Sequence, residues 1–272
     1  MSEEEPELIP RPTALARSFD RIGDEYDARP GYPSQVFELL VERCGLEEGA
    51  RVLEIGAGVG QATLPMLDLG AVVTVVDPGA ALMQRLLERT TGRRVEVIVA
   101  EFERASLPAT AFDLVTSATA FHWVEAVAGV EQCARVLRPA GWLAVWWTLF
   151  GDEARPDPFH DVLRPILEER APQLVRPETA HAAHRRDLLA RARIIETSPA
   201  FGPVDVHVID WEGVHDAVGL RRLFGTFGGW IMLPDALRAE LLDEIERIAD
   251  DEFGGTVRRP YQTLIFTSQR AA

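Results

Sequence analysis

The sequence predicts an α/β protein, with a mostly parallel sheet covered by helices on both faces. Short β-branched runs alternate with helical stretches, and such alternation is typical of parallel strands joined by crossover helices. At 272 residues, with 47% hydrophobic and 26% charged residues, the chain has the size and balance of one globular core with an attached lobe. The five predicted strands of the first half are Val52–Ile55, Val72–Val76, Val95–Val99, Phe112–Ser117 and Trp142–Trp147.

The first elements lead into this core. Residues 1–18 are polar, contain three prolines and are expected to form an ill-ordered tail. Ser34–Cys44 carries apolar residues at helical spacing, and Gly45 is placed to end that helix. We therefore predict a core over residues 19–148.

The second half begins with a different pattern. Residues 149–203 have a helical pattern that is interrupted by prolines, and they are expected to form a lid or an insertion. Residues 204–272 return to strand character in Val204–Asp210 and Tyr261–Thr267, which flank two helical segments. These two strands are expected to pair antiparallel at the sheet edge and to complete the sheet and a substrate pocket.

The composition excludes several classes of partner. The net charge of −15 disfavours nucleic acid, and the chain contains neither Lys nor Asn, which removes Schiff-base chemistry and a P-loop lysine. No apolar run is long enough to span a membrane, and the acidic, proline-broken start is unlike a signal peptide, so a cytoplasmic location without a membrane partner is expected. Cys44 and Cys133 are isolated and predicted to be buried packing residues, and no metal site is predicted.

A glycine turn follows the first strand. Val52–Thr63 reads VLEIGAGVGQAT, a strand that runs into a turn and then a helix expected near Gly60. Such a turn brings a ligand close to the backbone and to the positive end of a helix. The glycines have GxGxG spacing, whereas the dinucleotide fingerprint needs a glycine where this chain has Gln61. This difference counts against a dehydrogenase.

Carboxylates and an aromatic residue follow the next two strands. Asp77 is placed to accept hydrogen bonds from both hydroxyls of a ribose. Glu101 suits an exocyclic adenine amine, and Phe102 suits an adenine face. A glycine turn alone also serves simple strand–helix packing, but three strand ends in register favour a cofactor site.

From Phe19 to Trp147 these motifs resemble those of class I S-adenosylmethionine-dependent methyltransferases, in the small-molecule subgroup that includes trans-aconitate methyltransferase-like proteins. The resemblance implies a Rossmann-like seven-stranded sheet with a reversed last strand, S-adenosyl-L-methionine as cofactor, S-adenosyl-L-homocysteine as product and a small-molecule methyl acceptor. The family more often has Asp at the position of Glu101.

By motif match, Glu54 and Gly56 serve the methionine end, Asp77 the ribose, Glu101 and Phe102 the adenine, and the backbone near Ala118 the amino group. Leu82 lies where relatives often place a methionine against the adenine. The resemblance thus implies the following cofactor-binding residues: Tyr26, Arg29, Glu54, Gly56, Ala57, Gly58, Gly60, Asp77, Pro78, Leu82, Glu101, Phe102 and Ala118.

Two segments have both a functional and a structural interpretation. His122 follows the fourth strand and is either a catalytic base or a satisfied structural residue, with Trp123 beside it as a wall. In Phe19–Pro33, Tyr26 and Arg29 either cap the methionine carboxylate or belong to a solvated arm. A third, aromatic-rich stretch forms either a substrate pocket or ordinary core: Trp211, Phe224, Phe227 and Trp230.

Two alternative functions remain open at this point. One is a catalytically silent S-adenosylmethionine-binding accessory protein, because a fold does not fix a function. The other is a nucleotide-dependent oxidoreductase. The sequence does not predict the methyl acceptor or the oligomeric state.

Overall fold

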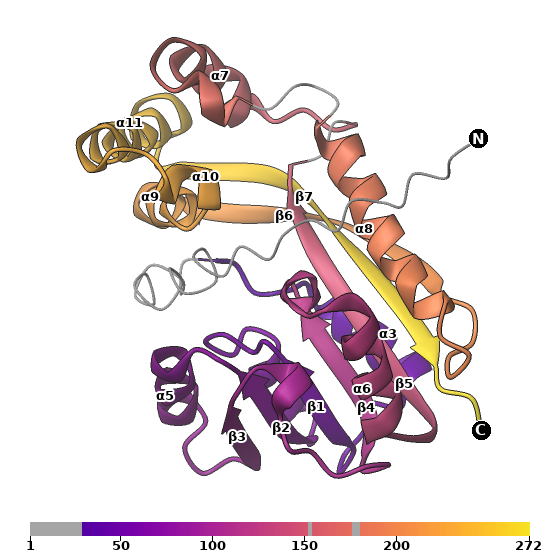
Figure 1. Ribbon diagram of the computed structural model, residues 1–272. Coiled ribbons are helices and arrows are strands. Elements are labelled where there is room, and N and C mark those ends of the chain that lie inside the picture. Colours follow the sequence, from indigo (N-terminus) through magenta and orange to yellow (C-terminus); the bar gives the residue numbers. More distant parts are fainter. Residues whose placement is uncertain (1–28, 152–153, 176–179) are drawn as a thin grey trace, which may run out of the picture.

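The computed structural model describes residues 29–151, 154–175 and 180–272 of the chain. Its centre is a seven-stranded sheet in the order β3-β2-β1-β4-β5-β7-β6 (Figure 1). β7 runs antiparallel to both of its neighbours, which confirms the predicted seven-stranded sheet with a reversed last strand. The strands are β1 (Arg51–Ile55), β2 (Val72–Asp77), β3 (Val95–Val99), β4 (Phe112–Ala118), β5 (Leu137–Phe150), β6 (Asp205–Asp216) and β7 (Thr256–Gln269).

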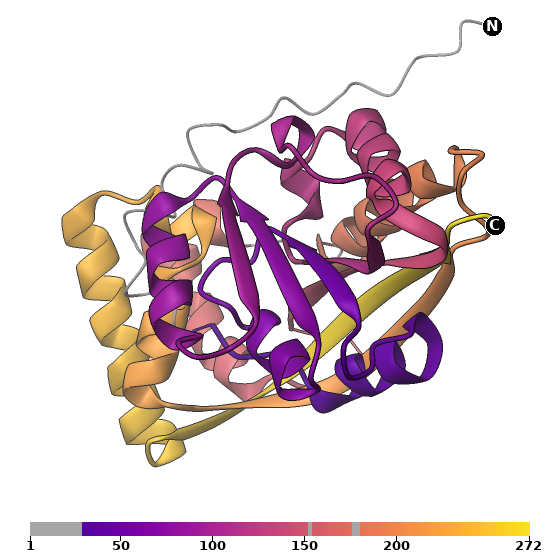
Figure 2. The ribbon, with the colours of Figure 1, turned by 90° about the horizontal axis from the view of Figure 1, so that it is seen from below.

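Both faces of the sheet are covered by helices, because its central strands are apolar on both sides. α3 (Ser34–Cys44), α4 (Thr63–Asp68) and α5 (Ala80–Arg89) pack on one face. α6 (Ala126–Val136) and α8 (Ala180–Glu196) pack on the other. Figure 2 shows the indigo α3 and the magenta α6 on opposite sides of the strands.

α3 has the predicted bounds, and Gly45 ends it in the left-handed region at φ 71°, which glycine adopts without steric cost. Cys44 and Cys133 are buried in the clusters on opposite faces, as predicted for packing residues. None of the helices in the described part of the chain is long and apolar enough to cross a membrane.

A separate helical lobe sits at the far end of the long β6–β7 ribbon (Figure 1). Its helices share one apolar cluster with the first residues of β7. The ladder between the two strands ends at the pair Asp216 and Thr256, and three of the lobe's helices connect these two residues. The lobe consists of α7 (Pro158–Arg170), α9 (Ala217–Gly225), α10 (Gly228–Ile231) and α11 (Asp235–Phe253).

The segment 149–203 therefore contributes one helix to the lobe and another to a face of the sheet. α7 joins the lobe, whereas α8 packs on the sheet beside α6. Whether either helix closes over a bound cofactor stays a prediction.

Candidate active site

The glycine turn after β1 has the backbone that its sequence requires. Gly56, Gly58 and Gly60 have φ values of 72°, 56° and 95°, a region that residues with a Cβ seldom adopt. A Cβ on Gly56 would stand 2.3 Å from the Cβ of Ala120, so this position also has no room for a side chain. The helix begins at Thr63 rather than near Gly60, because left-handed glycines cannot continue a right-handed helix.

Glu54, on β1, is the buried acid of the site. It is 1% exposed, and its Oε2 accepts a 2.6 Å hydrogen bond from the Thr63 hydroxyl. Among the described residues its other oxygen, Oε1, has no hydrogen-bond partner. Burial raises the pKa of Glu54 from 4.5 to about 7; the Thr63 hydrogen bond lowers it and the charge of Asp77 raises it further. An unpaired buried oxygen is costly, so Glu54 is poised to receive a donor from a ligand.

Asp77 ends β2, next to β1 in the sheet. Its Oδ2 accepts from the Gly58 amide at 3.1 Å and its Oδ1 from the Gly79 amide at 2.8 Å. These two bonds hold the carboxylate against the glycine turn. Glu101 follows β3, the next strand, and forms a half-exposed ion pair with Arg104 at 3.2 Å. The two acids thus follow neighbouring strands at one edge of the sheet.

A pocket lies beside the glycine turn and is open to solvent. It brings together six of the residues predicted to bind cofactor: Arg29, Glu54, Gly56, Ala57, Gly58 and Ala118. It also contains residues that the sequence analysis missed: Pro30, Tyr32, Gln61, Ala62, Thr119, Thr148 and Phe150.

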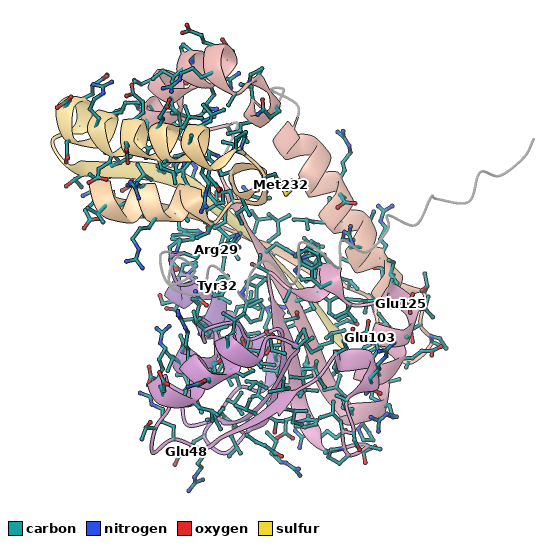
Figure 3. All side chains as sticks on the ribbon, turned by 60° about the vertical axis from the view of Figure 1, so that its left-hand side comes forward. Arg29, Tyr32, Glu48, Glu103, Glu125 and Met232 are labelled. Carbon is teal, nitrogen blue, oxygen red and sulfur yellow. The ribbon has the colours of Figure 1, made fainter. Side chains whose placement is uncertain are left out.

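Arg29 and Tyr32 lie between the helical lobe and the sheet (Figure 3). Arg29 donates from Nε to the Thr226 hydroxyl at 3.1 Å and from Nη2 to its carbonyl at 3.0 Å, at the end of α9. The Tyr32 hydroxyl is 3.1 Å from that of Thr119, which follows β4. The segment at Arg29 therefore connects the lobe to the sheet across the pocket. Tyr26 lies outside the described residues.

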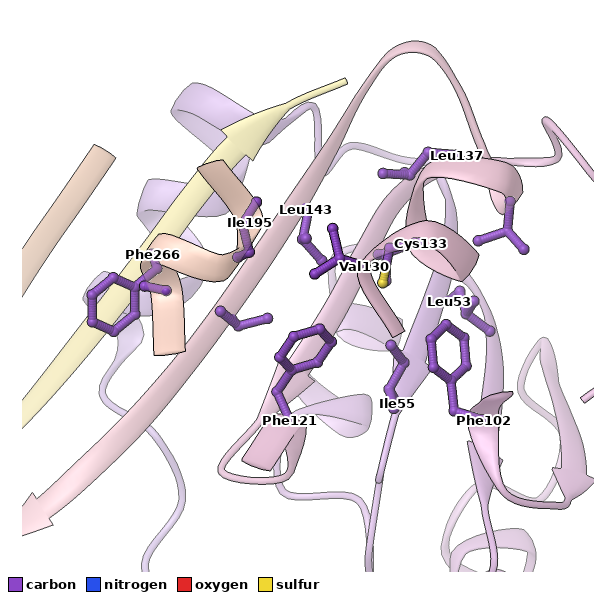
Figure 4. Close-up of a cluster of buried hydrophobic side chains, with 14 of the residues drawn as sticks. Leu53, Ile55, Phe102, Phe121, Val130, Cys133, Leu137, Leu143, Ile195 and Phe266 are labelled. Atoms are coloured by element: carbon purple, nitrogen blue, oxygen red, sulfur yellow. The ribbon is translucent and has the colours of Figure 1, made fainter. Parts of the chain in front are cut away.

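Several predicted cofactor residues lie away from this pocket. Phe102 is 3% exposed, and its ring packs beside Leu53 and Cys133 in the sheet cluster (Figure 4). Its ring belongs to the core, which corrects the expectation of an open adenine face. Leu82, on α5, is buried in the apolar cluster between α5 and the sheet, and Pro78 is exposed. At Gly60 a Cβ would stand 2.5 Å from Cδ1 of Leu86, so this glycine allows the turn to pack on α5.

His122 is not placed as the predicted proton acceptor. Its Nδ1 accepts a 3.1 Å hydrogen bond from Nε1 of Trp147, and an indole nitrogen only donates. The neutral ring must then carry its proton on Nε2, which leaves neither nitrogen ready to take another. His122 and Trp123 stack at 4.6 Å and are not among the residues that line the pocket. The geometry favours the structural interpretation of His122.

The predicted aromatic wall is mostly lobe core. Phe224 and Trp230 are each 5% exposed and lie in the lobe cluster. Phe227 is closer to the pocket, because its ring is 5.2 Å from that of Phe150, which lines it. Trp211 meets the ring of Tyr261 edge to face, with the ring centroids 5.1 Å apart. The aromatic residues of the lobe thus pack behind the pocket, and Phe150, which contacts Phe227, lines the pocket itself.

The residues that the sequence analysis missed had little sequence signal. Tyr32 stands in a GYP turn, and Phe150 ends an aromatic strand, positions that are common outside sites. Thr148 is the polar residue within the apolar run Trp142–Phe150 of β5, and this break in the pattern was the usable signal.

Comparison with known proteins identifies the class. Residues 53–145 match the family model described as "Methyltransferase domain". An uncharacterized methyltransferase of Mycobacterium tuberculosis is 31% identical over 235 residues, which are 86% of each chain. The chain belongs to the class I S-adenosylmethionine-dependent methyltransferases.

Two further proteins extend the comparison. A malonyl-[acyl-carrier protein] O-methyltransferase of Halorhodospira halophila is 34% identical over 147 residues, 51% of this chain and 48% of that one. A similar fold occurs in phosphoethanolamine N-methyltransferase 2 of Haemonchus contortus, which was solved with S-adenosylhomocysteine. The TM-score is 0.58 at 16% sequence identity, and the match covers 98% of this chain and 62% of that one. The protein is an S-adenosylmethionine-dependent methyltransferase.

The residues present fit this cofactor. The unpaired Oε1 of Glu54 offers an acceptor in the lining of the pocket, and Gly56 brings backbone without a side chain to the same lining. The buried oxygen of Glu54 has no partner in the described part of the chain, so it is the feature that points to a ligand.

Proposed function

We propose that the protein methylates a small molecule, within the trans-aconitate methyltransferase-like subgroup that its sequence resembles. The observation that carries this proposal is the pocket, which is concave and framed by the glycine turn, the ends of β4 and β5 and the segment at Arg29. A concave site lined by backbone, polar and aromatic groups suits a small acceptor. The net charge of −15 disfavours a nucleic-acid acceptor.

In this proposal each strand end binds one part of the cofactor. Glu54 and the amides near Gly56 hold the methionine end, with Arg29 at its carboxylate. Asp77 holds the ribose hydroxyls, and Glu101 the adenine amine. Pairing with the cofactor's ammonium would relieve the unpaired oxygen of Glu54 and lower its raised pKa.

The cofactor supplies an electrophilic methyl group on a sulfonium. The chain's own contribution is binding, alignment and exclusion of water, which by themselves account for much of the acceleration of an in-line displacement. The Arg29 contacts to Thr226 tie the lobe to the sheet and so fix the two walls between which donor and acceptor must align.

The cofactor site is tested with Asp77→Ala. The change removes the acceptor for the ribose and the anchor of the Gly58 amide, and we expect S-adenosylhomocysteine to bind roughly 10- to 100-fold more weakly in calorimetric titration. Asp250→Ala, at an exposed aspartate of α11, is the matched control. Equal affinity in the folded Asp77 variant and the wild type would refute the assignment.

The acceptor class is tested with a labelled methyl donor. The wild type is incubated separately with a metabolite fraction below 1 kDa, with protein and with RNA. Label should appear in the metabolite fraction. Label in protein or RNA alone contradicts a small-molecule acceptor, and cofactor binding without transfer to any fraction favours the accessory protein instead.

A further inference from the structure

Three side chains from neighbouring strands form a line of hydrogen bonds that ends in the pocket. Nε1 of Trp211 on β6 donates to the Thr263 hydroxyl on β7 at 3.0 Å. The Thr263 hydroxyl is 3.1 Å from the hydroxyl of Thr148 on β5. Thr148 and Thr263 are directly paired in the β5–β7 ladder, and Thr148 lines the pocket.

The direction of this line is fixed by its first member. An indole nitrogen only donates, so the Thr263 oxygen must accept from Trp211. Thr263 is 0% exposed, and among the described residues Thr148 is its other hydroxyl partner. Were Thr148 the donor, the Thr263 proton would be buried without an acceptor, at a cost of about 1–3 kcal/mol. Thr263 therefore donates to Thr148.

The Thr148 proton is then directed away from Thr263. Thr148 is partly exposed and faces the pocket, where its hydroxyl is presented as a donor. Phe150, two residues further along β5, lies on the same side of the strand and also lines the pocket. The centroid of its ring lies 5.2 Å from that of Phe227 and 5.1 Å from that of Tyr261, so an apolar wall stands beside the donor.

We propose that Thr148 determines acceptor specificity by donating its hydroxyl proton to a carbonyl or carboxylate oxygen of a methyl acceptor whose apolar body lies on Phe150. Trp211 and Thr263 are positioning residues that fix the direction of this donor. The inference rests on the proposed small-molecule function and deepens it. Glu54 and the glycine turn are assigned to the cofactor, which leaves the β5 side of the pocket for the acceptor.

The test compares two aromatic probes of similar size on protein saturated with S-adenosylhomocysteine. Phenylacetate carries accepting oxygens, whereas 2-phenylethylamine, as its cation, has only donors. The variants are Thr148→Val, which removes the hydroxyl at nearly constant shape, and Thr148→Ser, which keeps it. We expect calorimetry to show phenylacetate binding the wild type and Thr148→Ser alike and Thr148→Val about 10-fold or more weakly. Phenylethylamine should not distinguish them.

The positioning residues have their own readout. Thr263→Val and Trp211→Phe leave the Thr148 hydroxyl in place but free to rotate, so phenylacetate should bind about 3-fold more weakly, less than the loss in Thr148→Val. Among the indole N–H signals of the six tryptophans, the one that disappears in Trp211→Phe should shift in Thr263→Val. A signal that stays in place contradicts the hydrogen-bond line.

The outcomes separate this inference from the function on which it rests. Equal phenylacetate affinity in the wild type and Thr148→Val, tighter binding of phenylethylamine, or binding of neither probe overturns the inference while cofactor binding remains intact. Failure of the wild type to bind S-adenosylhomocysteine overturns both. Unchanged S-adenosylhomocysteine affinity in Thr148→Val shows that the variant is folded and that the effect lies in the acceptor site.

Discussion

Replacing Glu54 with Gln should make the cofactor-free protein more stable at pH 8 while impairing cofactor binding. The carboxyl is 1% exposed, and one of its oxygens has no hydrogen-bond partner among the described residues. Gln keeps the size of Glu and an oxygen that accepts from Thr63. It removes the buried negative charge.

The magnitude follows from the raised pKa. In the unfolded chain Glu54 loses its proton near pH 4.5, whereas in the folded protein it holds the proton up to about pH 7. The folded state thus binds more protons over this interval, so the contribution of Glu54 to wild-type stability falls as the pH rises from 4.5 to about 7 and then stays constant. At roughly 1.4 kcal/mol per pH unit, the loss amounts to about 3 kcal/mol.

The assay is urea unfolding of both proteins without cofactor, in steps from pH 5 to pH 8. The difference in free energy of unfolding should be small at pH 5 and about 3 kcal/mol in favour of Glu54→Gln at pH 8. Glu48→Gln, at an exposed glutamate, controls for the loss of one charge (Figure 3). A variant no more stable than the wild type at pH 8 would refute the argument from burial. S-adenosylhomocysteine should bind the variant at least about 10-fold more weakly.

Two further substitutions test the site. Gly56→Ala puts a Cβ 2.3 Å from Ala120 on a backbone with φ 72°, so it should lower the free energy of unfolding by about 2–4 kcal/mol and abolish S-adenosylhomocysteine binding. The control Gly31→Ala, which has open space around its Cβ, should do neither. Normal binding by Gly56→Ala would contradict a turn that needs this close approach. His122→Gln keeps a hydrogen-bond acceptor for the Trp147 indole. Turnover with a methyl acceptor found in the metabolite fraction should therefore fall by less than about 10-fold at each pH. A loss of roughly 10²- to 10⁴-fold would show that His122 is the base.

The sequence predicted the central strands well because their apolar runs are buried from both sides. Val52–Ile55 and Val72–Val76 are apolar except for Glu54 and Thr74, and the structure extends each run by one residue. The helix Ser34–Cys44 was predicted to the residue because Gly45 marks its end. Asp77 was placed correctly at the end of β2, since parallel strands bring their ends to one edge.

The predictions that failed or were missed depended on contacts that are distant in sequence. Phe102 packs inward because β1 and α6 offer it an apolar cluster, which no local pattern reveals. The Thr148–Thr263 pair joins residues 115 apart, and its existence depends on the register of β5 and β7. The aromatic spacing of Phe224 and Trp230 suits a pocket and a core equally, and here the lobe's own helices bury both.

The pair Asp216 and Thr256, where the β6–β7 ladder ends, makes α9, α10 and α11 the loop of a single β-hairpin. The two attachment points of this loop lie about 5 Å apart, as in any antiparallel pair. A different helical segment with similarly spaced ends can be grafted there without altering the register of the sheet or the glycine turn. Thr148 and Phe150 line the pocket from β5, outside this loop, so such a graft would change the lobe's contact with Arg29 and leave the β5 side of the pocket in place.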